Sequence, residues 1–178
     1  MIQRSLSIAA AAMVALAMSV LIGAPRGVVN AQDARTVAID GNWRADLNRQ
    51  VANSAHWSWM LRRVERQGDN LSIELSIRNN ATTRRPIFLD PEYMANIALI
   101  DADTAARFPL LSVSGVSDQL LEVERSKSTS ATFIFRYPEG AKSVRFNSSW
   151  IAMFMQGAAS VIAVEFPLDL PPPEARAI

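Results

Sequence analysis

The chain has 178 residues, with 18 lysines and arginines against 17 aspartates and glutamates, and it contains no cysteine. The lack of thiols excludes disulfide bonds, thiolate metal sites, a cysteine nucleophile and a lipid anchor on an N-terminal cysteine. The balanced charge argues against a protein that coats nucleic acid, because such proteins neutralise phosphates with clustered lysines and arginines.

Residues 1–31 have the pattern of a secretory signal peptide. Arg4 and the amino terminus give a positive start, residues 6–22 are apolar without a charge, and residues 29–31 (Val-Asn-Ala) place small side chains at the −3 and −1 positions of a cleavage site. The alternative is an uncleaved anchor, because the apolar run has the length of a short membrane span. The Pro-Arg-Gly break at 25–27 favours cleavage after residue 31, so we expect an exported protein, periplasmic or extracellular in a bacterium, with no remaining membrane span.

Removal of the leader leaves 147 residues (178 − 31), which is the size of one domain with a hydrophobic core. The leader contains two arginines and no acidic residue, so the mature chain has 16 basic (18 − 2) and 17 acidic residues. We expect an exported domain held together by its core alone, with no nucleic-acid partner and no cofactor.

Residues 32–56 are predicted to form an N-terminal extension ahead of the main domain. Within it, Trp43, Leu47 and Val51 recur every four residues, which is the spacing of one face of a short amphipathic helix over Asn42–Asn53. The pattern leaves open whether this helix forms, because signals for short elements are weak.

The clearest strand follows this extension. Residues 71–78 (Leu-Ser-Ile-Glu-Leu-Ser-Ile-Arg) alternate strictly between apolar and polar side chains, which predicts a strand with one face in the core. Residues 67–70 (Gln-Gly-Asp-Asn) form a turn signal, and residues 57–66 are predicted to be the hairpin partner. Asn79 and Asn80 end the strand with side chains that suit turns.

Further short strands are predicted along the rest of the chain. Ala131, Phe133 and Phe135 share one face of the strand at 130–136, and Pro167 is predicted to end the last strand. We therefore expect an antiparallel sandwich of about eight strands over residues 57–167, with a proline-rich tail over residues 168–178. The remaining strands are predicted at 87–89, 96–100, 108–113, 120–123, 143–146 and 160–166.

The chain resembles a group of exported immunoglobulin-like domains of unknown function in bacteria, which occur alone or in lipoproteins. The resemblance is carried by residues 70–80, a strand that ends in paired asparagines, and residues 98–103 (Ala-Leu-Ile-Asp-Ala-Asp), a strand that enters an acidic turn. It continues in residues 129–138, a strand that runs into proline, and residues 141–146 (Ala-Lys-Ser-Val-Arg-Phe). The resemblance as a whole covers about residues 57–166.

Two segments depart from that group. Residues 124–127 (Glu-Arg-Ser-Lys) stand where these domains often have a Pro-Gly turn, and residues 150–155 are more apolar than the group suggests. The resemblance implies an immunoglobulin-like β-sandwich, and it brings neither catalytic residues nor a function.

Residues 150–155 (Trp-Ile-Ala-Met-Phe-Met) are the first candidate for partner binding. Both faces of this run are apolar, so it is either a strand buried on both sides or an exposed patch at an interface. In the interface interpretation, Trp150, Met153, Phe154 and Met155 contact the partner, and methionines suit an adaptable surface.

The second candidate is an arginine patch. Arg62, Arg63 and Arg66 lie close in sequence, and Arg84 and Arg85 follow the paired asparagines. If the first hairpin and the loop after it converge, these side chains form a basic surface for an anionic partner. The alternative is a solvated strand face balanced by nearby carboxylates.

Other residues have weaker claims to chemistry. His56 is the only histidine, so a Ser-His-Asp triad would need that ring, and we expect a structural or solvated histidine. Asp101 and Asp103, with Asp90 and Glu92 nearby, could bind calcium, but an acidic hairpin turn explains them better.

Trp57 and Trp59 share one strand face, where they are either core residues or a surface that stacks on a ligand. The sequence therefore favours a non-catalytic exported module that binds another envelope protein. The alternatives are a small envelope hydrolase that uses His56 and nearby carboxylates, and a calcium-dependent adhesion module. The oligomeric state is left open.

Overall fold

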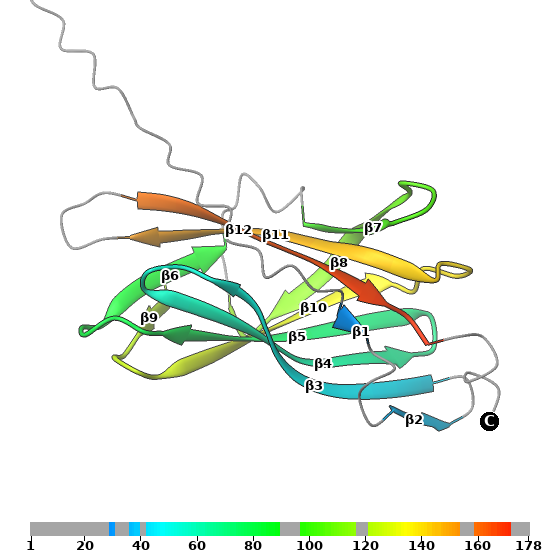
Figure 1. Ribbon diagram of the computed structural model, residues 1–178, viewed down its shortest axis with the longest axis horizontal. Helices are drawn as coiled ribbons and strands as arrows, with labels where there is room; N and C mark the ends of the chain where they lie inside the picture. Colours follow the sequence, from blue (N-terminus) through cyan, green and yellow to red (C-terminus); the bar gives the residue numbers. More distant parts are fainter. Residues whose placement is uncertain are drawn as a thin grey trace, which may run out of the picture.

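A computed structural model describes residues 29–30, 36–39, 42–89, 97–116, 121–153 and 159–171 (Figure 1). Every regular element in these residues is a β-strand, and no helix among them is long and apolar enough to cross a membrane. The all-β prediction is therefore confirmed. The strands are β1 (Val29–Asn30), β2 (Thr36–Ile39), β3 (Asn42–Asn53), β4 (Trp57–Gln67), β5 (Asn70–Asn79), β6 (Arg85–Leu89), β7 (Ala98–Asp101), β8 (Arg107–Ser114), β9 (Leu121–Val123), β10 (Ser128–Arg136), β11 (Ser143–Met153) and β12 (Ala159–Asp169).

The strands form two layers that face each other, with β11 and β12 above β3, β4 and β5 in Figure 1. One layer has the order β2-β3-β4-β5-β10-β8. The other is built on β11, which pairs with β12 along one edge and with both β7 and β6 along the other edge, while β9 lies beyond β6. All described pairs are antiparallel except β1 with β12.

Strand β8 belongs to both layers. Its first residues pair with β7, where Arg107 lies opposite Ile100, and Leu110 to Ser114 pair with β10. A register shift between Ile134 and Phe135 accompanies this change of layer, as expected where a strand leaves one sheet for another. The two layers are thus continuous through hydrogen-bonded strands.

The alternating patterns place their apolar side chains as predicted. Leu71, Ile73, Leu75 and Ile77 on β5 are all fully buried, and so are the three inward residues of β10. The β4–β5 hairpin closes through Gly68, whose φ of 57° at the first central position suits a two-residue turn between twisted strands.

The short helix over Asn42–Asn53, which the sequence pattern left open, does not form, because this segment is strand β3. A spacing of four residues is also twice the two-residue period of a strand, and Ala45 between Trp43 and Leu47 faces inward as well. Asn48, with φ of 51°, lies in a bulge between Asp46 and Arg49 that shifts the register of β3 on β4. Since β3 pairs with β4 along its length, the sandwich begins before the predicted boundary at residue 57.

Two strand ends also differ from the prediction. Residues 143–146 were expected to form a short strand, but β11 continues to Met153 and pairs with β12 throughout. Pro167 does not end β12, which runs on to Asp169. The described partner on the outer side of β12 begins only at Leu168, so a residue without an N–H is tolerated at position 167.

Aromatic rings join the two layers. Phe133 on β10 contacts both Phe146 and Trp150 on β11, with ring centroids 5.2 and 6.2 Å apart. Trp59 on β4 also meets Trp150, at 6.2 Å, and Phe135 meets Phe146 at 6.1 Å. Each such pair adds about 0.5–1.5 kcal/mol beyond the burial of its area, so this cluster stabilises the contact between the layers.

Phe133→Ala is expected to lower the free energy of unfolding by roughly 3–5 kcal/mol, because it removes a fully buried ring that touches both layers. The matched control is Thr132→Ala, the half-buried neighbour on the outer face of β10. Chemical denaturation followed by circular dichroism measures both. Equal stability of the Phe133 variant and the control would contradict the inward position of Phe133.

Candidate interaction surfaces

Trp150 is not an exposed contact residue. It is fully buried between the layers, and its Nε1–H donates a hydrogen bond of 3.0 Å to the Oγ of Ser148, which is buried too. The interface interpretation is therefore wrong for Trp150. Met153 ends β11, while Phe154 and Met155 lie outside the described residues.

A different set of apolar side chains faces outward in the structure. Ile151, between the buried Trp150 and Ala152, lies opposite Phe88 of β6 on one side and Val161 of β12 on the other. Phe88 and Ile151 are half-buried, and Val161 is 47% exposed. Three neighbouring strands thus place apolar side chains side by side on the outer face of the layer; we call Phe88, Ile151 and Val161 the apolar row.

The apolar row ends at an unpaired strand edge. Within the described part of the chain, the outer edge of β12 has a partner only at Leu168 and Asp169, where β1 pairs with it. Glu165 and Pro167 protect the edge next to that contact, as charged residues and prolines do in natural sheets. Residues 159–164 (Ala-Ser-Val-Ile-Ala-Val) have no charge and no proline, so this half of the edge is unprotected.

Sequence reasoning missed this row because it depends on pairing between distant segments. Phe88 and Ile151 are brought together only by the register of β6 on β11. The nearest sequence signal was the β-branched composition of the last strand, which predicts a strand and not the face that it exposes.

The predicted arginine patch does not form, because its members lie at different places and three of them, Arg63, Arg66 and Arg84, are paired with acids. Arg63 contacts Asp46 at 3.1 Å and Glu74 at 3.7 Å across three neighbouring strands. Arg66 contacts Glu139 at 2.7 Å and lies 3.9 Å from the ring centroid of Tyr137.

Arg84 belongs to the other end of the sandwich, where it forms ion pairs with Glu122 and Glu124. Arg66 lies opposite Leu71 at one end of β5, whereas Arg84 follows Asn79 at the other end. Eight residues of strand separate these ends by about 26 Å. Arg85 begins β6 on the same side as Arg84, and Arg62 is exposed on β4.

Asn79 organises the end of the sandwich that carries Arg84. Its buried amide donates to the carbonyl oxygens of Thr83 (2.9 Å) and Val123 (2.8 Å), and its Oδ1 accepts the N–H of Ala81 at 2.8 Å. Its backbone N–H donates to the carbonyl of Lys127 at 3.0 Å. The Asn79 side chain thereby joins the loop after β5 to the end of β9, and its backbone joins the segment between β9 and β10, a role that its interpretation as a turn residue did not include.

Trp57 and Trp59 are core residues, 1% and 0% exposed, which decides between the two alternatives for this pair. His56 lies in the short connection between β3 and β4, and its carbonyl accepts the N–H of Asn80 at 2.8 Å. In the residues that the structure describes, no three histidine, aspartate or glutamate side chains gather as metal ligands would.

Asp101 shapes the acidic hairpin turn between β7 and β8. Its Oδ1 accepts the N–H groups of Asp103 (2.8 Å) and Thr104 (2.9 Å), as in an Asx turn. The hydrogen bond from the Thr104 backbone is the main reason that the pKa of Asp101 is lowered from 3.8. This accounts for the acidic turn without a metal ion; Asp90 and Glu92 lie outside the described residues.

Comparison with known proteins gives no relative by sequence, because no family model and no curated protein matches the chain. Among solved structures it is similar to the GAE domain of yeast GGA1 (16% identity, 70% of this chain and 99% of that one, TM-score 0.41). It is also similar to an uncharacterised β-sandwich protein of Clostridium difficile 630 (7% identity, 78% and 95%, TM-score 0.32) and to a FixG-related protein of Vibrio parahaemolyticus (14% identity, 67% and 100%, TM-score 0.31). All three scores lie below 0.5, so the description as a β-sandwich rests on the strand pairing and the contacts between the layers.

Asn79→Ala is expected to lower the free energy of unfolding by about 2–3 kcal/mol, because it leaves buried backbone groups without their partner. The control is Asn80→Ala, the exposed neighbour, which should change stability by less than about 0.5 kcal/mol. Urea denaturation measures both. A stable Asn79 variant would show that the loops at this end are held in another way.

Proposed function

We propose that this chain is an exported, non-catalytic module that binds another envelope protein along the edge of β12. The single observation that supports this most strongly is the uncharged half-edge over residues 159–164 with the apolar row beside it. The leader-like pattern of residues 1–31 supports export.

An unpaired edge favours one kind of contact. The N–H and C=O groups of residues 159–164 that have no strand partner among the described residues can hydrogen-bond an extended segment of another protein, which then adds a strand to the sheet. Natural proteins usually protect such an edge, and β12 is protected only from Glu165 onward. The exposed Val161 lies at the unprotected half and supplies an apolar contact at the point where a partner strand would begin.

The apolar row gives this edge side-chain specificity. A strand added to β12 would extend the row from Phe88, Ile151 and Val161 onto the partner, so its outward residues would meet an apolar neighbour. Cleavage after residue 31 would also remove β1 and free the edge at Leu168 and Asp169. The exported form would therefore offer a longer edge than the full chain.

Val161→Lys is expected to abolish partner capture while leaving the fold intact, because a lysine on an edge strand opposes strand addition. The experiment cross-links the protein in intact cells and identifies conjugates recovered from the envelope fraction. Leu111→Lys is the matched control, since Leu111 is 54% exposed and lies on β8 in the other layer.

The wild type and the Leu111 variant should give the same conjugate, and the Val161 variant should lose it. The same conjugate from all three proteins would overturn the role of β12. Recovery of the protein from the cytosol with residues 1–31 attached would overturn export.

A further inference from the structure

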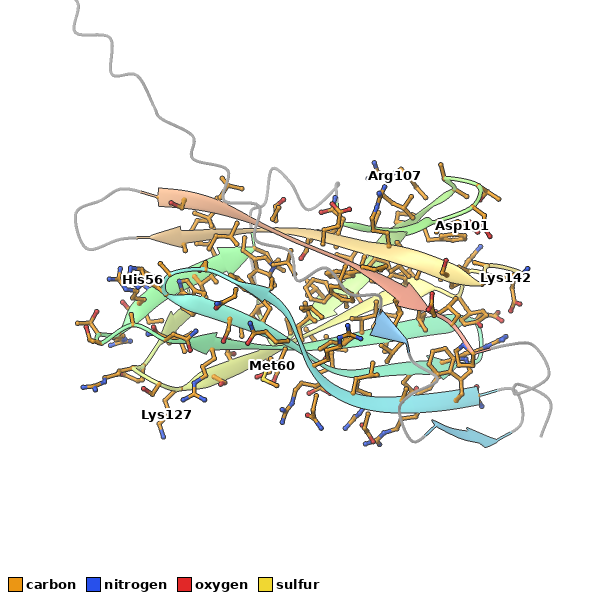
Figure 2. All side chains as sticks on the ribbon, in the orientation of Figure 1. His56, Met60, Asp101, Arg107, Lys127 and Lys142 are labelled. Carbon is orange, nitrogen blue, oxygen red and sulfur yellow. The ribbon has the colours of Figure 1, made fainter. Side chains whose placement is uncertain are left out.

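One end of the sandwich gathers positive charge. It is the end marked by His56 and Lys127 in Figure 2, opposite the end that carries Asp101, Arg107 and Lys142. Three segments meet there, residues 53–57, 78–86 and 121–128, and together they contain five basic and two acidic residues, a net charge of +3 (5 − 2). We call this the basic end; its charged residues are Arg78, Arg84, Arg85, Arg125, Lys127, Glu122 and Glu124.

Hydrogen bonds between backbones fix these segments to one another. The N–H of Asn80 donates to the carbonyl of His56 at 2.8 Å, and the N–H of Ser126 donates to the carbonyl of Asn79 at 3.1 Å. With the buried amide of Asn79, they join all three segments. The backbone that carries these charged residues is therefore rigid, so little backbone conformational entropy is lost when they bind a partner.

The two acidic residues of the basic end already form ion pairs within the chain. Arg84 forms ion pairs with both Glu122 and Glu124. The basic end also has three exposed cations, Arg78, Arg125 and Lys127. The two carboxylates cannot balance the charge of all five basic residues. The sequence predicted a basic surface from Arg84 and Arg85 together with the arginines of β4, whereas the structure brings Arg84 and Arg85 to these three residues instead.

We propose that the basic end docks on the anionic surface of a phospholipid bilayer. The charges come from connecting segments and strand ends at one end of a rigid sandwich, and such an arrangement can bring several cations to a flat anionic plane at once. A cavity of about 250 Å³, lined by Asp69, Arg136, Tyr137 and Glu139, lies at the opposite end of the sandwich and is not part of the basic end. Among the residues that the structure describes, the exposed large apolar side chains are Leu111 on β8 and Val161 on β12, outside the three segments of the basic end, so the proposed association is electrostatic and reversible.

The test measures binding of the purified protein, as recovered from cells, to vesicles of phosphatidylglycerol and of phosphatidylcholine. The variant combines Arg78→Gln, Arg125→Gln and Lys127→Gln. Each basic residue near an anionic surface contributes about fivefold to partitioning, so the triple variant should bind phosphatidylglycerol roughly 100-fold more weakly. In about 1 M salt the wild type should lose the same preference, because the screening length falls to about 3 Å.

The matched control combines Arg62→Gln, Arg107→Gln and Lys142→Gln, which removes the same charge from exposed positions away from the basic end. It should keep the preference for phosphatidylglycerol. The proposal is overturned if both triple variants bind equally, or if the wild type does not prefer anionic vesicles. It is also overturned if the wild type binds a polyglutamate peptide and not the vesicles. Failure here would leave the cross-linking result at β12 unchanged, so the two proposals are tested separately.

Discussion

The contact between aromatic rings of the two layers is the interaction on which the rest of this structure depends. Trp59, Phe133 and Phe135 come from one layer and meet Trp150 and Phe146 of the other, with no covalent link to support them. The side chains at these positions are fully buried, so the centre of the interface between the layers is held by packing. Within β11, Ser148 accepts the indole N–H of Trp150 and satisfies this polar group in the core.

The aromatic contacts fix which face of each strand points into the core, and this determines which side chains lie on the outer surfaces. Because Trp150 and Ala152 point into the core, Ile151 must point out and meet Phe88 and Val161. The edge of β12 and the basic end are likewise consequences of register: β11 positions β12 along its length, and β5 ends where the loops carrying Arg84 and Arg125 meet. The proposed contacts with a partner protein and with a membrane therefore use different parts of one rigid frame.

Local patterns in the sequence predicted the strands well and their partners poorly. The alternation around Ile73 and around Phe133 could be recognised because one face is apolar and the other polar. The run that begins at Trp150 has apolar residues on both sides, so its inward face could not be predicted from periodicity. The possible helix around Leu47 does not form, and the sequence pattern was ambiguous because a four-residue spacing fits a strand as well as a helix. The role of Asn79, the row beside β12 and the separation of the arginines depend on contacts between distant segments, which local patterns do not contain.

The most direct test of this account is quenching of tryptophan fluorescence by iodide in the native protein. All four tryptophans of the chain, Trp43, Trp57, Trp59 and Trp150, are at most 1% exposed. We expect blue-shifted emission that iodide barely quenches until the protein unfolds. Native emission with a component quenched as readily as free tryptophan would contradict the burial of these rings and, with it, the packing of the two layers.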